Sequence, residues 1–182
     1  MRNGSFFAGV FFLFISSFLC SYEESRVFFS SDDLLSQFIQ QVKAEKNKIC
    51  LASYRLSNLQ VIRALLEAKK RGVHVEVVVD ETSFSQKSPL FLLEKEGIST
   101  FIWRKPSFQK KRLGEGMRHV FCIFGEECCW VGSYGFSSKQ SLLMQTSALL
   151  LQNKEIVKKY FNEFQMLKKR TLPLSQYVER KK

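Results

Sequence analysis

Residues 117–138, MRHVFCIFGEECCWVGSYGFSS, constrain the fold of this chain most strongly. Residues 118–124 are rich in aromatic and β-branched side chains, and residues 128–131 form a second apolar run. Gly125 and Glu126 separate the two runs, which is typical of the turn of a β-hairpin. The sequence therefore predicts two antiparallel strands that lead into a loop of small residues, Gly-Ser-Tyr-Gly.

Strand and helix patterns alternate around this hairpin. Further strands are predicted over residues 26–30, 48–54, 73–79, 98–103 and 142–152. Helices are predicted over residues 34–46, capped by Ser31 or Asp32, over 59–71, capped by Asn58, and over 90–96 and 154–169. The run at 73–79 is almost entirely apolar, which favours a parallel strand covered on both faces. The expected fold class is α/β, with a mixed, largely parallel sheet and helices on both faces.

The first residues read as a targeting segment. Arg2 is the only charge before Glu23, and residues 6–19 are apolar, so residues 1–21 are predicted to be a signal peptide or an N-terminal membrane anchor. Residues 22–170 then form one domain, and residues 171–182 a basic C-terminal tail. The predicted location is exported: a bacterial periplasm, the membrane surface, or the medium.

Five cysteines are present, of which Cys20 lies in the targeting segment. Cys50, Cys122 and the Cys128-Cys129 pair lie within apolar strand patterns, which indicates buried free thiols, although export makes disulfides an open alternative. No spacing of Cys and His is typical of zinc ligands, so neither a metal nor another cofactor is expected.

The chain is strongly basic, with 28 Lys and Arg against 17 Asp and Glu and a net charge of +11. Such a field attracts phosphates, in nucleic acid or in anionic phospholipid, while a role in solubility alone is the alternative. Five cations gather directly before the hairpin, in what is called here the basic segment: Arg104, Lys105, Lys110, Lys111 and Arg112. This segment is interpreted as a phosphate-binding lip or, alternatively, as a solvated loop.

The pattern Met-x-His-x-Phe-x-Ile-x-Gly followed by Trp-Val-Gly-Ser-Tyr-Gly-Phe-Ser-Ser resembles the phospholipase D superfamily, most closely its single-motif Nuc and zucchini-type members. The resemblance implies a phospholipase D-like fold and phosphodiester hydrolysis without metal. In that chemistry one imidazole attacks phosphorus, a second protonates the leaving oxygen, and lysines neutralise the phosphate. Because this chain carries one motif copy, the resemblance also implies a homodimer with a shared site.

The family signature is His-x-Lys-x4-Asp, followed by Gly-Ser-x-Asn. The match is anchored on Met117 and Gly132. It places Arg118, Val120 and Gly125 at the His, Lys and Asp positions, and Ser133 matches the Ser of the Gly-Ser segment. Gly135 stands at the Asn position, and Thr146 stands at a further position where the family has Glu. Side chains alternate along a strand, so His119 is expected to face away from Arg118. His119 could act as a nucleophile only if a bulge near Gly116 rotated it.

These substitutions favour a catalytically degenerate domain that binds a phosphodiester through Arg118, Ser133 and the basic segment. Two alternatives stay open. One is an active phosphodiesterase, either phospholipase or endonuclease, with His119 as the candidate catalytic residue. The other is a protein without catalysis that binds a partner or a membrane surface through its basic face.

Overall fold

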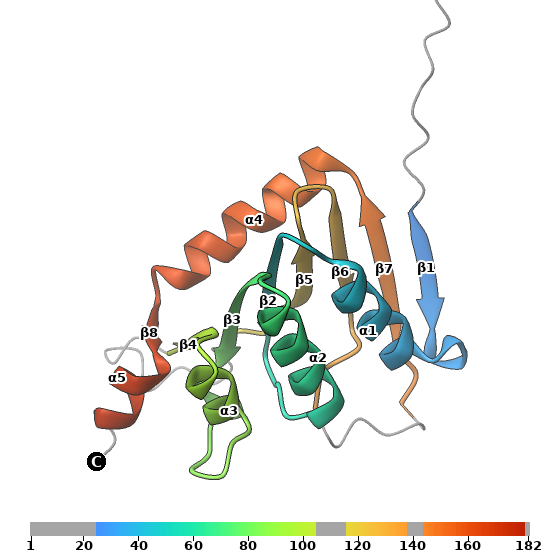
Figure 1. Cartoon of the computed structure of the whole chain (residues 1–182). Helices are drawn as coiled ribbons and strands as arrows, with labels where there is room; N and C mark the ends of the chain where they lie inside the picture. The colour runs from blue at the N-terminus through green and yellow to red at the C-terminus, as the bar shows by residue number, and fades with distance from the viewer. Residues whose placement is uncertain (1–24, 105–115, 138–143, 181–182) are drawn as a thin grey trace, which may run out of the picture.

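The computed structural model describes residues 25–104, 116–137 and 144–180 (Figure 1). Eight strands of these residues form one sheet in the order β1-β7-β6-β5-β2-β3-β4-β8. The strands are β1 (Arg26–Phe29), β2 (Lys48–Ser53), β3 (His74–Asp80), β4 (Ser99–Trp103), β5 (Val120–Phe124), β6 (Cys128–Gly132), β7 (Ser147–Gln152) and β8 (Thr171–Pro173). The helices are α1 (Leu34–Ala44), α2 (Leu59–Lys70), α3 (Leu90–Lys95), α4 (Lys154–Lys168) and α5 (Leu174–Glu179).

The mixed α/β architecture agrees with the sequence pattern, but the sheet is less parallel than predicted. Only β2 with β3 and β3 with β4 pair in parallel among the described strands. The other five pairs are antiparallel. The β-α alternation, which requires helical crossovers, ends at β4. After it, β5 and β6 are joined by the short turn at Gly125, and such a turn permits only antiparallel pairing.

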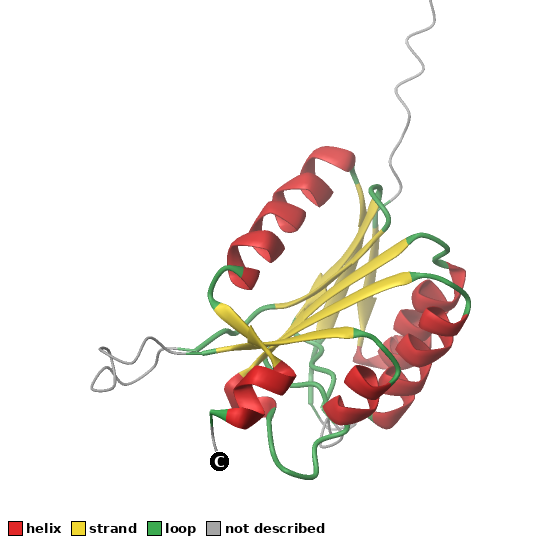
Figure 2. Cartoon of the chain, turned by 60° about the vertical axis from the view of Figure 1, so that its left-hand side comes forward, coloured by secondary structure: helices red, strands yellow, loops and turns green. Residues whose placement is uncertain are grey.

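Helices cover both faces of the sheet, as expected (Figure 2). Phe38 of α1 and Leu65 of α2 belong to the larger apolar core, on one face, together with Trp130 of β6. Phe164 of α4 belongs to a second core on the opposite face, together with Phe121 of β5. Both hairpin strands therefore contribute side chains to both cores, which explains why these strands lack a solvated face.

The C-terminal segment differs from the predicted tail. Residues 171–173 form β8, which pairs antiparallel with β4, and α5 follows directly. Leu174 and Tyr177 of α5 are buried in the larger core. The basic residues at 180–182 suggested a tail, but the apolar side chains before them cover the edge of the sheet beside β4.

The helix caps are partly as predicted. Asn58 caps α2, since its Oδ1 accepts hydrogen bonds from the backbone N–H groups of Gln60 and Val61. The cap of α1 is Asp33, in a left-handed backbone conformation, rather than Ser31 or Asp32. A short 3-10 helix, Ser30–Asp32, precedes α1 and moves the cap by one residue.

The four cysteines of the described residues are free thiols, and all except the partly buried Cys128 are buried, as predicted. Burial raises the pKa of Cys50 to about 12 and that of Cys128 to about 11, and it raises the pKa values of Cys122 and Cys129 as well. Among the described residues there is no group of Cys, His, Asp and Glu suited to a metal, and no helix long and apolar enough to cross a membrane. Residues 1–21 lie outside the described residues.

Candidate functional site

The parallel strands β2 and β3 end at the same edge of the sheet, and the chain approaches β5 there. Ser53 and Asp80 are the last residues of β2 and β3, and Ser53 pairs with Val120, the first residue of β5. The carboxyl ends of parallel strands are the usual place for ligands in open α/β sheets. Residues 116–119, which include the family motif position Arg118, lie at this edge.

Two hydrogen bonds fix the backbone on either side of Arg118. The N–H of Met117 donates to Oδ2 of Asp80 at 2.8 Å, and the N–H of Tyr54 donates to the carbonyl oxygen of His119 at 3.0 Å. The Arg118 side chain itself is exposed and has no hydrogen-bond or ion-pair partner among the described residues. The backbone at Arg118 is therefore held in place, while its permanently charged guanidinium is exposed and can meet an external anion.

Asp80 is a buried acid at this edge, with only 4% of its surface exposed. Its Oδ1 accepts hydrogen bonds from the N–H of Thr82 at 2.9 Å and from the hydroxyl of Thr82 at 2.7 Å. With Met117 on Oδ2, three donors satisfy the carboxylate. Asp80 was not among the site residues predicted from the sequence. The one sequence feature that could have indicated it is its position as a single carboxylate at the end of an apolar strand.

Two motif positions cannot contribute cationic or acidic chemistry here. Val120, at the family Lys position, is 7% exposed and belongs to the larger core. Gly125, at the family Asp position, lies at the opposite end of β5 and has a left-handed backbone, with φ of +60°. A Cβ at Gly125 would lie 3.5 Å from Oε2 of Glu45, so this position belongs to the turn rather than to the site around Arg118.

His119 lies on the face of the sheet covered by α4, as the alternation of side chains predicts. Its Nε2 is 3.3 Å from Oε1 of Glu163 in α4, and its ring contacts Phe121 edge-on at 5.6 Å between centroids. The side chains of His119 and Glu163 are each 45% exposed. The only other histidine of the chain, His74, is the first residue of β3 and so lies at the opposite end of that strand from Asp80. Neither imidazole therefore occupies the family His position.

Ser133 is exposed and connects β6 to β7. Its N–H donates to the carbonyl oxygen of Ser147 at 3.0 Å, and its Oγ accepts from the N–H of Ser147 at 3.2 Å. No described contact joins Ser133 to Arg118. The preceding Gly132 is required because a Cβ there would collide with the carbonyl oxygen of Ser147. The Gly-Ser pair is thus explained by the close approach of two strands.

The remaining motif and basic positions are only partly described. Gly135 is buried, and Thr146 donates its N–H to Oγ of Ser30 at 2.8 Å, so Thr146 ties β7 to the chain after β1. The Arg104 guanidinium lies 5.9 Å from the ring centroid of Tyr177. The other four residues of the basic segment, Lys105, Lys110, Lys111 and Arg112, lie outside the described residues.

A family model matches most of the chain. The family model described as cardiolipin synthase, PLD-like domain, matches residues 35–168. The chain belongs to the phospholipase D-like family. Relatives named phospholipase D, from Rickettsia prowazekii (strain Madrid E) and Rickettsia typhi (strain ATCC VR-144 / Wilmington), are each 21% identical over 127 residues. The match covers 69% of this chain and 58% of each relative, so this phospholipase D-like chain spans little more than half their length.

Solved structures share the phospholipase D-like fold. Nuc from Salmonella typhimurium, a phospholipase D family member, superposes with a TM-score of 0.72 at 17% identity, covering 82% of this chain and 97% of Nuc. NucT from Helicobacter pylori superposes with a TM-score of 0.74 at 16% identity, covering 83% and 99%.

Two further solved structures with lower TM-scores have names that describe different activities. TrmBL2, an archaeal chromatin protein with a novel mode of DNA binding, has a TM-score of 0.61 at 13% identity, covering 85% of this chain and 56% of TrmBL2. Phosphatidylserine synthase from Haemophilus influenzae Rd KW20 has a TM-score of 0.64 at 13% identity, covering 88% and 42%. The fold thus occurs both in a protein that binds DNA and in an enzyme named for the synthesis of a phospholipid.

Proposed function

We propose that this phospholipase D-like domain binds a phosphodiester and does not hydrolyse it. The observation that carries the proposal is the position of Arg118. Arg118 replaces the family imidazole at the edge where β2 and β3 end, with its backbone held on both sides and its side chain exposed. A guanidinium donates paired hydrogen bonds to phosphate oxygens but stays protonated, so it binds phosphate and cannot attack phosphorus.

The loss of hydrolysis follows from what surrounds Arg118. Covalent phosphodiester cleavage needs a nucleophile and an acid, and both of the chain's imidazoles lie elsewhere. The family Lys position holds Val120, whose side chain is buried in the core. Removing groups that act together in one reaction step lowers the rate by orders of magnitude, so binding is the function that the remaining residues support.

The ligand chemistry is a phosphodiester in nucleic acid or in an anionic phospholipid. The net charge of +11 favours both, and the fold occurs in a DNA-binding chromatin protein and in a phosphatidylserine synthase.

We also propose, from residues 1–21, that the domain acts after export, either free or held at a membrane. A homodimer would bring two copies of Arg118 into one cationic cleft, and sedimentation of the purified chain tests that state.

A second candidate function is hydrolysis by His119. The observation that favours it is the contact with Glu163, because a carboxylate oxygen 3.3 Å from Nε2 orients the ring and leaves Nδ1 for chemistry. Turnover of bis(p-nitrophenyl) phosphate by the full chain, abolished by His119→Ala, would establish this function. The same turnover in wild type and His119→Ala would show that His119 is not the catalytic residue.

The binding proposal is tested with the full chain and two probes: a short single-stranded DNA oligonucleotide and vesicles of phosphatidylglycerol, with phosphatidylcholine vesicles as the neutral control. We expect binding to one anionic probe that weakens log-linearly with salt and that falls in Arg118→Ala. Arg63→Ala, which removes an exposed arginine of α2, is the matched control and should leave affinity nearly unchanged. Absence of binding to both probes would favour a protein-binding role and overturn the proposal.

A further inference from the structure

Asp80 is the one described carboxylate that is almost completely buried, and it lies directly beside the proposed ligand site. Its two oxygens are engaged in different ways. Oδ1 is held within the strand end by Thr82, whereas Oδ2 reaches across the sheet edge to the N–H of Met117, 37 residues away in sequence. The carboxylate therefore links the end of β3 to the segment that leads into β5.

The residues around this link are tightly placed. Met117 is 3% exposed and packs in the second core with Val78 and Trp103. A Cβ built on Gly116 would lie 3.5 Å from Oδ2 of Asp80 and 3.8 Å from Nε of Arg118. Asp80 and the Arg118 side chain thus flank the same point of the backbone.

The closeness of Asp80 and Arg118 does not produce an ion pair within the described residues. Asp80 already accepts three hydrogen bonds, and the guanidinium of Arg118 is exposed. Neutralisation of Arg118 by Asp80 would weaken its attraction for a phosphate. The arrangement instead directs the carboxylate to the backbone of the preceding residue and leaves the cation available.

We infer that Asp80 is a positioning residue for the ligand site: through the Met117 N–H it holds Arg118 where a phosphodiester can meet its guanidinium. This inference rests on the proposed function and names a determinant of the same site. Preorganisation of a binding group raises affinity because less conformational freedom is lost when the ligand binds. Loss of the Asp80 link should therefore weaken binding even though Asp80 itself does not touch the ligand.

The sign of the effect separates positioning from charge. Asp80→Asn removes a negative charge beside an anion site, and charge alone would strengthen binding of an anion. Its amide cannot accept all three hydrogen bonds that the carboxylate accepts, so the backbone at Met117 is released. We expect Asp80→Asn to bind the DNA oligonucleotide, or phosphatidylglycerol vesicles if only these bind, about tenfold more weakly.

A double-mutant cycle tests whether the effect acts through Arg118. If Asp80 positions Arg118, the loss in Asp80→Asn/Arg118→Ala should be close to that in Arg118→Ala alone, and both single variants should lower the salt slope on single-stranded DNA by about 0.7. A merely structural role would give additive losses. Glu76→Gln is the matched control, because it removes a carboxylate from the same strand without a contact to residues 116–119, and it should leave the salt slope unchanged.

The outcomes distinguish the two claims. No binding by wild type to either probe would overturn the proposed function. Binding that falls in Arg118→Ala but is unchanged or stronger in Asp80→Asn would overturn the positioning inference alone. If Asp80→Asn does not fold, Thr82→Val removes one hydrogen bond to Oδ1 and keeps the charge, so it should still weaken binding measurably; wild-type affinity in that variant would overturn the inference.

Discussion

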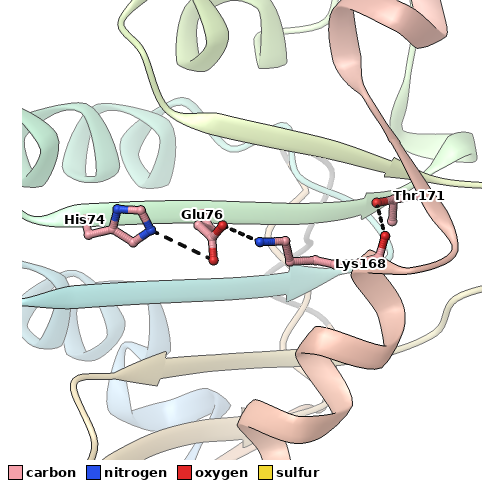
Figure 3. A network of polar contacts seen from close by, with 4 residues as sticks. All are labelled: His74, Glu76, Lys168 and Thr171. Carbon is pink, nitrogen blue, oxygen red and sulfur yellow. Dashed lines mark hydrogen bonds and ion pairs between the residues drawn. The ribbon is translucent and has the colours of Figure 1, made fainter.

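Nζ of Lys168 lies 2.5 Å from Oε1 of Glu76, so the last turn of α4 is joined to β3 by an ion pair (Figure 3). The Glu76 side chain is 12% exposed and that of Lys168 is 24% exposed, which shields the pair from solvent. Lys168 also lies 4.8 Å from the ring centroid of Phe101. This contact fixes α4 across the sheet face that also carries His119.

Removal of one partner should therefore destabilise the domain. Glu76→Gln leaves a partly buried ammonium without its counter-ion, and we expect the free energy of unfolding to fall by about 1–3 kcal/mol. Urea denaturation followed by circular dichroism measures the change. His74→Ala serves as the control, because the His74 ring is 60% exposed and lies 4.0 Å from Glu76. Equal stability of wild type and Glu76→Gln would show that the pair contributes nothing.

Alkaline pH should destabilise the protein through its thiols. The pKa of Cys50 is about 12 in the folded protein, against 9.0 for an unperturbed thiol, because burial disfavours the thiolate. Above pH 9.0 the unfolded chain releases this proton while the folded chain keeps it, so stability is complete below that pH and declines up to about pH 12. The slope for one such thiol is about 1.4 kcal/mol per pH unit.

The measurement compares urea denaturation at neutral and alkaline pH, under reducing conditions, in wild type and Cys50→Ala. The decline above pH 9.0 should be shallower in Cys50→Ala, since this variant lacks one titrating thiol. A decline of the same slope in both proteins would assign the alkaline effect to other groups.

The C-terminal helix should be part of the stable domain. Leu174 is fully buried against the larger core, so we expect Leu174→Ala to lower the free energy of unfolding by about 2–5 kcal/mol. Ser175→Ala, at the exposed neighbouring position, should change stability far less. Thermal denaturation of both variants tests this, and a small effect of Leu174→Ala would show that α5 is dispensable.

Gly132 should tolerate no side chain. Because a Cβ there meets the carbonyl oxygen of Ser147, Gly132→Ala should separate β6 from β7 and cost about 1–3 kcal/mol of stability. Gly116→Ala is the control for stability, since its Cβ would meet nothing closer than 3.5 Å. A midpoint of urea denaturation for Gly132→Ala equal to that of the control would contradict the close strand approach.

The sequence by itself determined the features that depend on neighbouring residues. The Asn58 cap is local, because its partners lie two and three residues away. The face of His119, directly before β5, follows from the alternation of side chains that continues into that strand, and the burial of the thiols follows from the apolar strand patterns. The match of Arg118 to the family His position likewise comes from the sequence motif alone.

Tertiary structure decided what depends on residues distant in sequence. The link from Asp80 to Met117 spans 37 positions, and the contact of His119 with Glu163 joins the residue before β5 to α4. Residues 171–179 form β8 and α5 and dock beside β4, although the basic residues that follow them predicted a tail. Periodicity and charge describe one segment at a time, whereas burial and hydrogen bonding across the sheet arise only when segments meet. For that reason Arg118 could be found by reading the motif, but the backbone contacts that hold it could not.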